Sequence, residues 1–235
     1  ARVAKVYMTT EISPASLLKV YHALGRKTEG RVAVKISTGE PGGHNFLDPN
    51  LIKGLVKEVN GTLVECNTAY AGKRNTVEDN MQAARDHGFT AIAPVDIMDA
   101  EGEVALPVKG GKHLKADYVG ANYLNYDFTI VLSHFKGHAM GGFGGAIKNM
   151  SIGIASAAGK ANIHTAGKTK TDLWNNLPEQ DAFLESMAES AKAVADHCGD
   201  RILYISVANN LSVDCDCDAS PEDPKMGDIG ILASL

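Results

Sequence analysis

The chain has 235 residues, of which 44% are hydrophobic, and its formal net charge is −5. This composition is typical of a packed globular protein, and without a basic run it excludes a typical nucleic-acid-binding surface. No apolar stretch approaches the roughly 20 residues of a membrane-spanning helix, and no secretory signal is recognisable, so we expect a cytoplasmic protein without membrane contact.

Strand and helix patterns alternate along the first half of the chain. Helices are predicted where Ser13, Asp48 and Thr76 can cap a helix, and the first two are followed by proline at the first helical position. In chain order, the expected strands are residues 2–8, 31–36, 62–66, 89–94, 126–132, 201–207 and 229–232. The expected helices are residues 14–24, 49–59, 77–86 and 181–196, and residues 97–120 predict a hairpin or an edge excursion.

This order of elements predicts an α/β fold. Strands that alternate with helices favour a mostly parallel, mixed sheet flanked by helices, in a Rossmann-like three-layer architecture. We expect one domain over residues 1–235. An α/β domain often continues with a further helix, so we expect the natural protein to extend past Leu235.

The main functional signal lies between His134 and His164, directly after a predicted buried strand. In open α/β sheets, ligands bind beyond the carboxyl ends of strands, and glycine lets the backbone approach a ligand closely. We expect His138 and Lys148 to be catalytic. The expected cradle for an anion or cofactor is Gly141, Gly142, Gly144 and Gly145 with Lys136. The alternative is a tight structural crossover with incidental histidines, since neither the Walker nor the dinucleotide motif matches.

A second glycine-rich loop, residues 37–45, also follows a predicted strand. Gly42 and Gly43 could bind a cofactor there, and His44 could act as a ligand or as an acid/base. The alternative is a plain connection between a strand and a helix.

Four cysteines are too few for a disulfide scaffold in a chain of this length. Cys215 and Cys217 lie in an Asp-Cys-Asp-Cys-Asp run and could bind one soft metal ion, nickel, zinc or iron, with His134, His138 or His164 as further ligands. The neighbouring aspartates are expected to raise the thiol pKa values, which argues against a reactive thiolate. The alternative is a solvated loop. Without a Cys-x-x-Cys-x-x-Cys run, we expect no iron–sulfur cluster within this chain.

Two motifs resemble a known family. They are the run from His134-Phe-Lys-Gly-His138 through Gly-Gly-Ala-Ile-Lys148-Asn149, and Asp214-Cys-Asp-Cys with Asp228-Ile-Gly-Ile-Leu-Ala-Ser. They are similar to a domain family of unknown function whose uncharacterised members are often labelled iron–sulfur centre proteins. Many members carry a ferredoxin-like module near residues 160–180, where this chain has a short Lys/Thr-rich stretch.

A more distant resemblance is to the nickel-pincer lactate racemases. Spacing matches at His138, at Gly142-Phe-Gly-Gly145, at Lys148, at Gly153-Ile-Ala-Ser156 and at His164. The resemblance implies that His138 is an acid/base, Lys148 tethers a cofactor and His164 binds nickel. The second racemase histidine corresponds to Lys73, and the substrate motif is replaced by residues 37–44, so a two-base reaction would need His44 or Lys73. We therefore expect common ancestry rather than a shared reaction.

These observations predict a protein that binds a metal or a cofactor, an isomerase or redox enzyme acting on a small-molecule ligand. The alternatives are a non-catalytic scaffold for a phosphorylated or anionic metabolite, and a scaffold that works with an iron–sulfur or redox partner protein.

Overall fold

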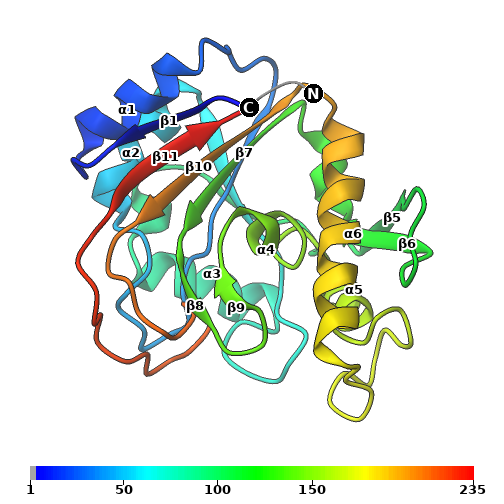
Figure 1. Cartoon of the computed structure of the whole chain (residues 1–235). Coiled ribbons are helices and arrows are strands. Elements are labelled where there is room, and N and C mark those ends of the chain that lie inside the picture. The colour runs from blue at the N-terminus through cyan, green and yellow to red at the C-terminus, as the bar shows by residue number, and fades with distance from the viewer. Residues whose placement is uncertain (1–3) are drawn as a thin grey trace.

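The structure is a computed structural model that describes residues 4–235 (Figure 1). Its α-helices are α1 (Pro14–Ala23), α2 (Pro49–Glu58), α3 (Val77–Asp86), α4 (Ala146–Met150), α5 (Ala157–His164) and α6 (Gln180–Cys198). Its strands are β1 (Val6–Thr9), β2 (Val32–Lys35), β3 (Gly61–Glu65), β4 (Val95–Ile97), β5 (Glu103–Pro107), β6 (Ala116–Gly120), β7 (Phe128–His134), β8 (Lys136–His138), β9 (Gly142–Gly144), β10 (Ile202–Ala208) and β11 (Gly230–Ser234). Within the described range, no helix is both long and apolar enough to cross a membrane.

A seven-stranded sheet has the order β1-β11-β10-β7-β2-β3-β4. Strands β10, β7, β2, β3 and β4 run parallel, whereas β11 pairs antiparallel with both β10 and β1. Two further pairs, β5–β6 and β8–β9, form small hairpin sheets. The sheet is therefore mixed but mostly parallel, which confirms the predicted fold class.

Helices cover both faces of the sheet, with α1 and α2 on one side and α4 and α6 on the other (Figure 1). Successive side chains of a strand point to opposite faces. Ile130 of β7 accordingly packs in the core under α1 and α2, and the next residue, Val131, packs in the core under α4 and α6. All seven residues of β7 are buried, and its central residues Ile130–Leu132 are continuously apolar, as expected for a strand covered on both faces.

The three predicted helix caps are confirmed. The side chains of Ser13, Asp48 and Thr76 accept backbone N–H groups at the starts of α1, α2 and α3, and proline follows the first two caps. These residues satisfy amide donors that the first turn of a helix leaves without partners.

Two elements differ from the prediction. Residues 89–94 were expected to form a strand, but Phe89–Ala91 is a 3₁₀ turn and the strand begins at Val95. Gly88, with a φ of 83°, ends α3 and turns the chain so that Phe89 enters the core. The glycine-rich segment between His134 and His164 contains the β8–β9 hairpin and helices α4 and α5. The sequence did not predict them, because the segment has no regular hydrophobic periodicity. The predicted first strand begins in residues 1–3, which lie outside the described residues.

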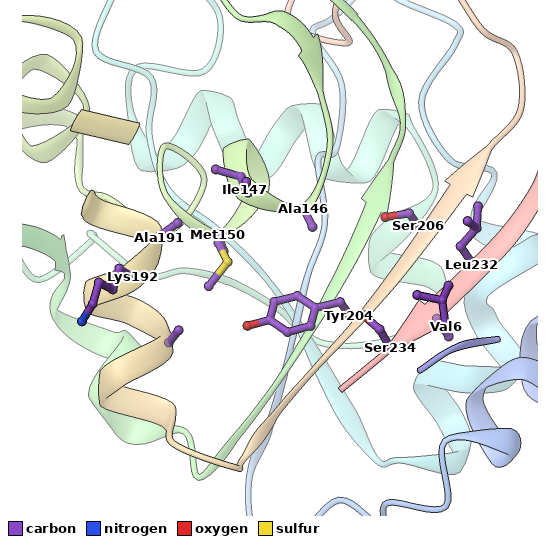
Figure 2. Close-up of a pocket in the computed structure, with 12 residues that line it drawn as sticks. Val6, Ala146, Ile147, Met150, Ala191, Lys192, Tyr204, Ser206, Leu232 and Ser234 are labelled. Atoms are coloured by element: carbon purple, nitrogen blue, oxygen red, sulfur yellow. The ribbon is translucent and has the colours of Figure 1, made fainter. Parts of the chain in front are cut away.

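An apolar groove of about 400 Å³ lies between α4, α6 and the sheet near β1. Figure 2 shows the side chains that line it. Tyr204, Leu232 and Val6 line its sheet side, and Ile147 and Met150 of α4 line another side. The next two residues of α4 after Ile147 line a different pocket, described below. Helix α4 thus separates an apolar groove from a polar pocket.

A buried carboxyl at Asp117 is expected to make stability depend on pH. Asp117 of β6 is fully buried and accepts a hydrogen bond from Ser190 Oγ of α6 at 2.9 Å, while its Oδ2 has no partner within residues 4–235. Burial raises the pKa of Asp117 from 3.8 to about 7. The folded protein therefore holds a proton that the unfolded chain releases, so this group's contribution to stability falls as the pH rises from about 4 to 7.

Asp117→Asn removes this titration. The free energy of unfolding of the variant minus that of the wild type should therefore increase by a few kcal/mol as the pH rises from about 4 to 7. Urea denaturation at several pH values measures this difference. Asp200→Asn, at an exposed position, is the control. A constant difference between Asp117→Asn and wild type across this range would contradict the prediction.

Candidate active site

The pocket lies where the parallel strands end. A cavity of about 400 Å³ opens at the carboxyl edge of the sheet, a volume that suits a small organic ligand. Each neighbouring strand contributes a lining residue: Ser37 after β2, Cys66 after β3, His134 at the end of β7, and Cys215 in the long loop after β10. This is the edge at which open α/β sheets bind ligands.

Two segments far apart in the sequence meet in this pocket. One imidazole nitrogen of His138 and the sulfur atoms of Cys215 and Cys217 all lie within 4.8 Å of one another. Lys148 Nζ lies 3.0 Å from Cys215 Sγ and 3.9 Å from Cys217 Sγ. The cysteine loop therefore folds over the glycine-rich segment, a contact that the sequence left open.

A buried ion cluster fixes the cysteine loop. Asp216, between the two cysteines, accepts hydrogen bonds from His134 Nδ1 at 2.9 Å and Lys136 Nζ at 3.1 Å. The amide of Glu40 donates to the Asp216 carbonyl at 2.9 Å. In the Cys215-Asp216-Cys217 run, the aspartate side chain is therefore buried among its partners, and both cysteines line the pocket.

The thiols do not behave as the neighbouring aspartates suggested. A hydrogen bond from the Cys217 thiol and the Lys148 ammonium lower the pKa of Cys215 well below its usual value, although burial opposes this. The same hydrogen bond, together with burial, raises the pKa of Cys217. The expectation that the aspartates would suppress a thiolate was wrong for Cys215, because the Cys217 thiol and Lys148 stabilise the Cys215 thiolate and Lys136 pairs with Asp216.

Lys148 is an ammonium in this arrangement. Burial disfavours its charged form, but the Cys215 thiolate outweighs this effect and raises the pKa of Lys148. An amine attacks only as the free base, so the ion pair holds Lys148 in its unreactive form.

The ring of His138 has a defined tautomer. Its Nδ1 accepts hydrogen bonds from the amides of Gly141 at 2.9 Å and Met140 at 3.2 Å. The neutral ring therefore carries its proton on Nε2, the nitrogen left for the pocket. Burial, and then the charge of Lys148, lower the pKa of His138 to about 4, so the ring is neutral near pH 7.

His164 has the opposite tautomer. Its Nδ1 lies 2.7 Å from the Lys160 carbonyl and must donate to it, so the lone pair of the neutral ring is on Nε2. Within residues 4–235 no hydrogen bond reaches that nitrogen. His164 lines the pocket and stacks on Phe183, and burial lowers its pKa to about 4.

Two other predicted histidines are placed differently. His134 is 2% exposed, and its two nitrogens face Asp216 and the Asn209 carbonyl, so neither is free to hold a metal in this conformation. His44 is exposed, with Nε2 3.8 Å from Asp223, and does not line the pocket.

The predicted cradle glycines have separate roles. Gly144 and Gly145 line the pocket, whereas Gly142 has a φ of 74° at the β8–β9 turn, a conformation that favours glycine. Gly42 and Gly43 pack against the carbonyls of Ala219 and Asp218 at the cysteine loop instead of lining the cavity.

Sequence reasoning missed a buried charge network in the pocket wall. Lys35 Nζ lies 2.8 Å from Glu65, and Arg74 Nε lies 2.8 Å from Glu40. Asn149 of α4 joins the network by accepting from Lys35 at 3.1 Å. A signal was present: Lys35 and Glu65 interrupt two apolar strands, and a charge in a buried strand requires a partner.

Comparisons with known proteins support the fold. The lactate racemase apoprotein from Thermoanaerobacterium thermosaccharolyticum superposes with a TM-score of 0.51 and 14% sequence identity, over 85% of this chain and 50% of that chain. A structural-genomics structure of a Thermotoga maritima protein superposes with a TM-score of 0.50 and 14% identity, over 94% of this chain and 54% of that one. The chain spans about half the length of each protein.

At this identity the likeness shows a shared fold, and it agrees with the distant resemblance in sequence. No curated protein sequence matches the chain. The family described as "Domain of unknown function (DUF362)" matches residues 32–235. Because this match covers nearly the whole chain, the protein belongs to the DUF362 family.

Proposed function

We propose that this domain is a metal-dependent enzyme in which Cys215 and Cys217 hold one soft divalent ion and His138 moves a proton at the bound ligand. The main support is that the two cysteine sulfurs lie within 4.8 Å of each other and of a His138 ring nitrogen, in a pocket that His164 also lines. The sequence resemblance to nickel-pincer racemases favours an isomerase or a redox enzyme.

The donor set fits a soft metal. Thiolate and imidazole ligands suit zinc, nickel or iron, and a site with three protein ligands leaves a position open for a substrate. Such an ion would supply Lewis-acid or redox chemistry when bound. Lys148 and a dication compete for the same Cys215 thiolate, so the ammonium must withdraw from the sulfur or lose its proton.

We propose His164 as the third metal ligand, although the His138 ring lies nearer the sulfurs. A metal-binding histidine commonly donates its other ring N–H to a carbonyl, as His164 does to Lys160. The Nδ1 of His138 instead accepts two amide hydrogens, which leaves a proton on Nε2. That geometry suits a proton donor better than a ligand.

Metal retention after anaerobic purification tests these roles. The wild type, loaded with Zn²⁺ or Co²⁺, should hold about one ion per chain and give a thiolate–cobalt charge-transfer band. Cys215→Ser, Cys217→Ser and His164→Asn should each weaken binding about tenfold or more, whereas His138→Gln should retain the ion. Cys198→Ala, away from the pocket, is the control.

The outcomes separate the alternatives. Loss of the ion in His138→Gln with retention in His164→Asn would exchange the two proposed roles. A wild type that binds no metal under these conditions would sink the metal-enzyme proposal and favour a non-catalytic scaffold for an anionic metabolite or a redox partner.

A further inference from the structure

Among the residues that the structure describes, one buried ammonium in the pocket has no anionic side chain as a partner. Its other cationic side chains each have an anionic partner. The pairs are Lys35 with Glu65, Arg74 with Glu40, Lys136 with Asp216, and Lys148 with the Cys215 thiolate. Within residues 4–235, no carboxylate lies within 4.0 Å of Lys160 Nζ. Lys160 is therefore the surplus positive charge of this pocket.

The position of Lys160 is determined by its helix. It lies in α5, four residues after the capping Ser156, and is 8% exposed. Its Nζ donates one hydrogen bond, to the Ala155 carbonyl at 2.7 Å, and an ammonium has three donors. Burial is the main reason that the pKa of Lys35 is lowered, and the charge of Lys160 lowers it further. A buried charge without a counter-charge is costly, so an anion beside it is favoured.

A second polar group in the pocket wall also lacks a partner. The hydroxyl of Tyr70 is buried, and no hydrogen bond reaches it within the described part of the chain. Tyr70 lines the same cavity as Lys160. Burial is the main cause that raises the pKa of Tyr70 to about 12, and the nearby Cys217 sulfur raises it further. Buried hydroxyls nearly always have a partner, so an unpaired one in a pocket wall suggests a ligand atom.

The remaining lining suits the body of an organic molecule. Met140, Ile152, Leu173 and Trp174 line the cavity beside the polar groups, and Trp174 is 63% exposed. We infer that the pocket binds a small organic anion, whose charged group pairs with Lys160 and whose second polar atom bonds the Tyr70 hydroxyl. This inference rests on the proposed function in taking the same pocket as the active site, and it assigns ligand recognition to two residues that the sequence did not single out.

Trp174 provides a direct test, because it is the single tryptophan of the chain and lines this pocket. The probes are benzoate, phenyl phosphate and the neutral benzamide. Benzoate, phenyl phosphate or both should change the fluorescence saturably, with affinities about tenfold or more above that of benzamide. The two anions distinguish a carboxylate-binding from a phosphate-binding pocket.

Substitutions identify the residues. Lys160→Met should weaken anion binding about tenfold or more and abolish the preference over benzamide, and Tyr70→Phe should weaken it severalfold. The controls are Lys168→Met, at an exposed lysine of the neighbouring loop, and Tyr204→Phe, in the separate groove of Figure 2. Lys160→Gln is a second variant that keeps a donor for the Ala155 carbonyl.

Metal content measured on the same samples separates this inference from the proposed function. Anion preference that depends on Lys160 in a protein that binds no metal would support the inference and contradict the metal enzyme. Equal affinity for benzoate and benzamide, no binding of any probe, or unchanged anion binding in both Lys160 variants would overturn the inference whether or not metal is bound.

Discussion

Replacing Glu65 by leucine is expected to lower the free energy of unfolding by about 3–5 kcal/mol. Glu65 is 5% exposed and accepts from Lys35 Nζ at 2.8 Å and from the Thr38 amide at 2.9 Å. Its removal leaves Lys35, which is 1% exposed, without a counter-charge inside the sheet. Urea denaturation at constant pH measures the loss.

Two comparisons test the physical cause. The double variant Lys35→Met/Glu65→Leu should recover most of the stability, because replacing a whole buried pair by apolar side chains is often nearly neutral. Glu78→Gln, at an exposed position of α3, should change stability by less than about 0.5 kcal/mol. A loss below about 1 kcal/mol in Glu65→Leu would mean that solvent screens the pair as it does at a surface.

Replacing Gly137 by alanine is expected to take the site apart while the sheet stays folded. A Cβ at this position would lie 2.0 Å from the carbonyl oxygen of Val213, a backbone atom that cannot rotate away. The Gly137 amide also donates to the Ser212 carbonyl at 2.8 Å, so the same contact holds the cysteine loop. The loop must therefore move away, and Cys215 must move away from Lys148.

Metal affinity and secondary structure measure the two parts of this prediction. The affinity for Zn²⁺ should fall about tenfold or more, while the far-ultraviolet circular dichroism stays that of the wild type. Gly227→Ala is the matched control, since it lies in the same long loop and has no atom within 4 Å of the added Cβ. If Gly137→Ala kept its metal affinity, the contact with Val213 would not be what positions the cysteines.

Several residues that the sequence singled out line one pocket, whereas others lie outside it. Proximity of the glycine loop to the cysteine loop was a condition of the metal hypothesis, and the two do meet through Lys148 and Cys215, 67 residues apart. His44 was expected at the same edge, but its loop directs it to the surface. Tyr70 and Lys160 had no signal of their own, because a residue type alone does not show whether its polar atoms find partners.

The sequence by itself determined the layered α/β fold, since strand periodicity, the Ser13, Asp48 and Thr76 caps and the prolines after the first two caps act within a few neighbouring residues. Only the tertiary structure decided which side chains are charged and which have polar atoms without a hydrogen-bond partner. Asp216 could be assigned as the anchor of His134, 82 residues away, only after the strands were ordered and the loop placed. The physical reason is that pKa values, tautomers and unmet hydrogen bonds depend on burial and on partners from distant segments, which no local pattern encodes.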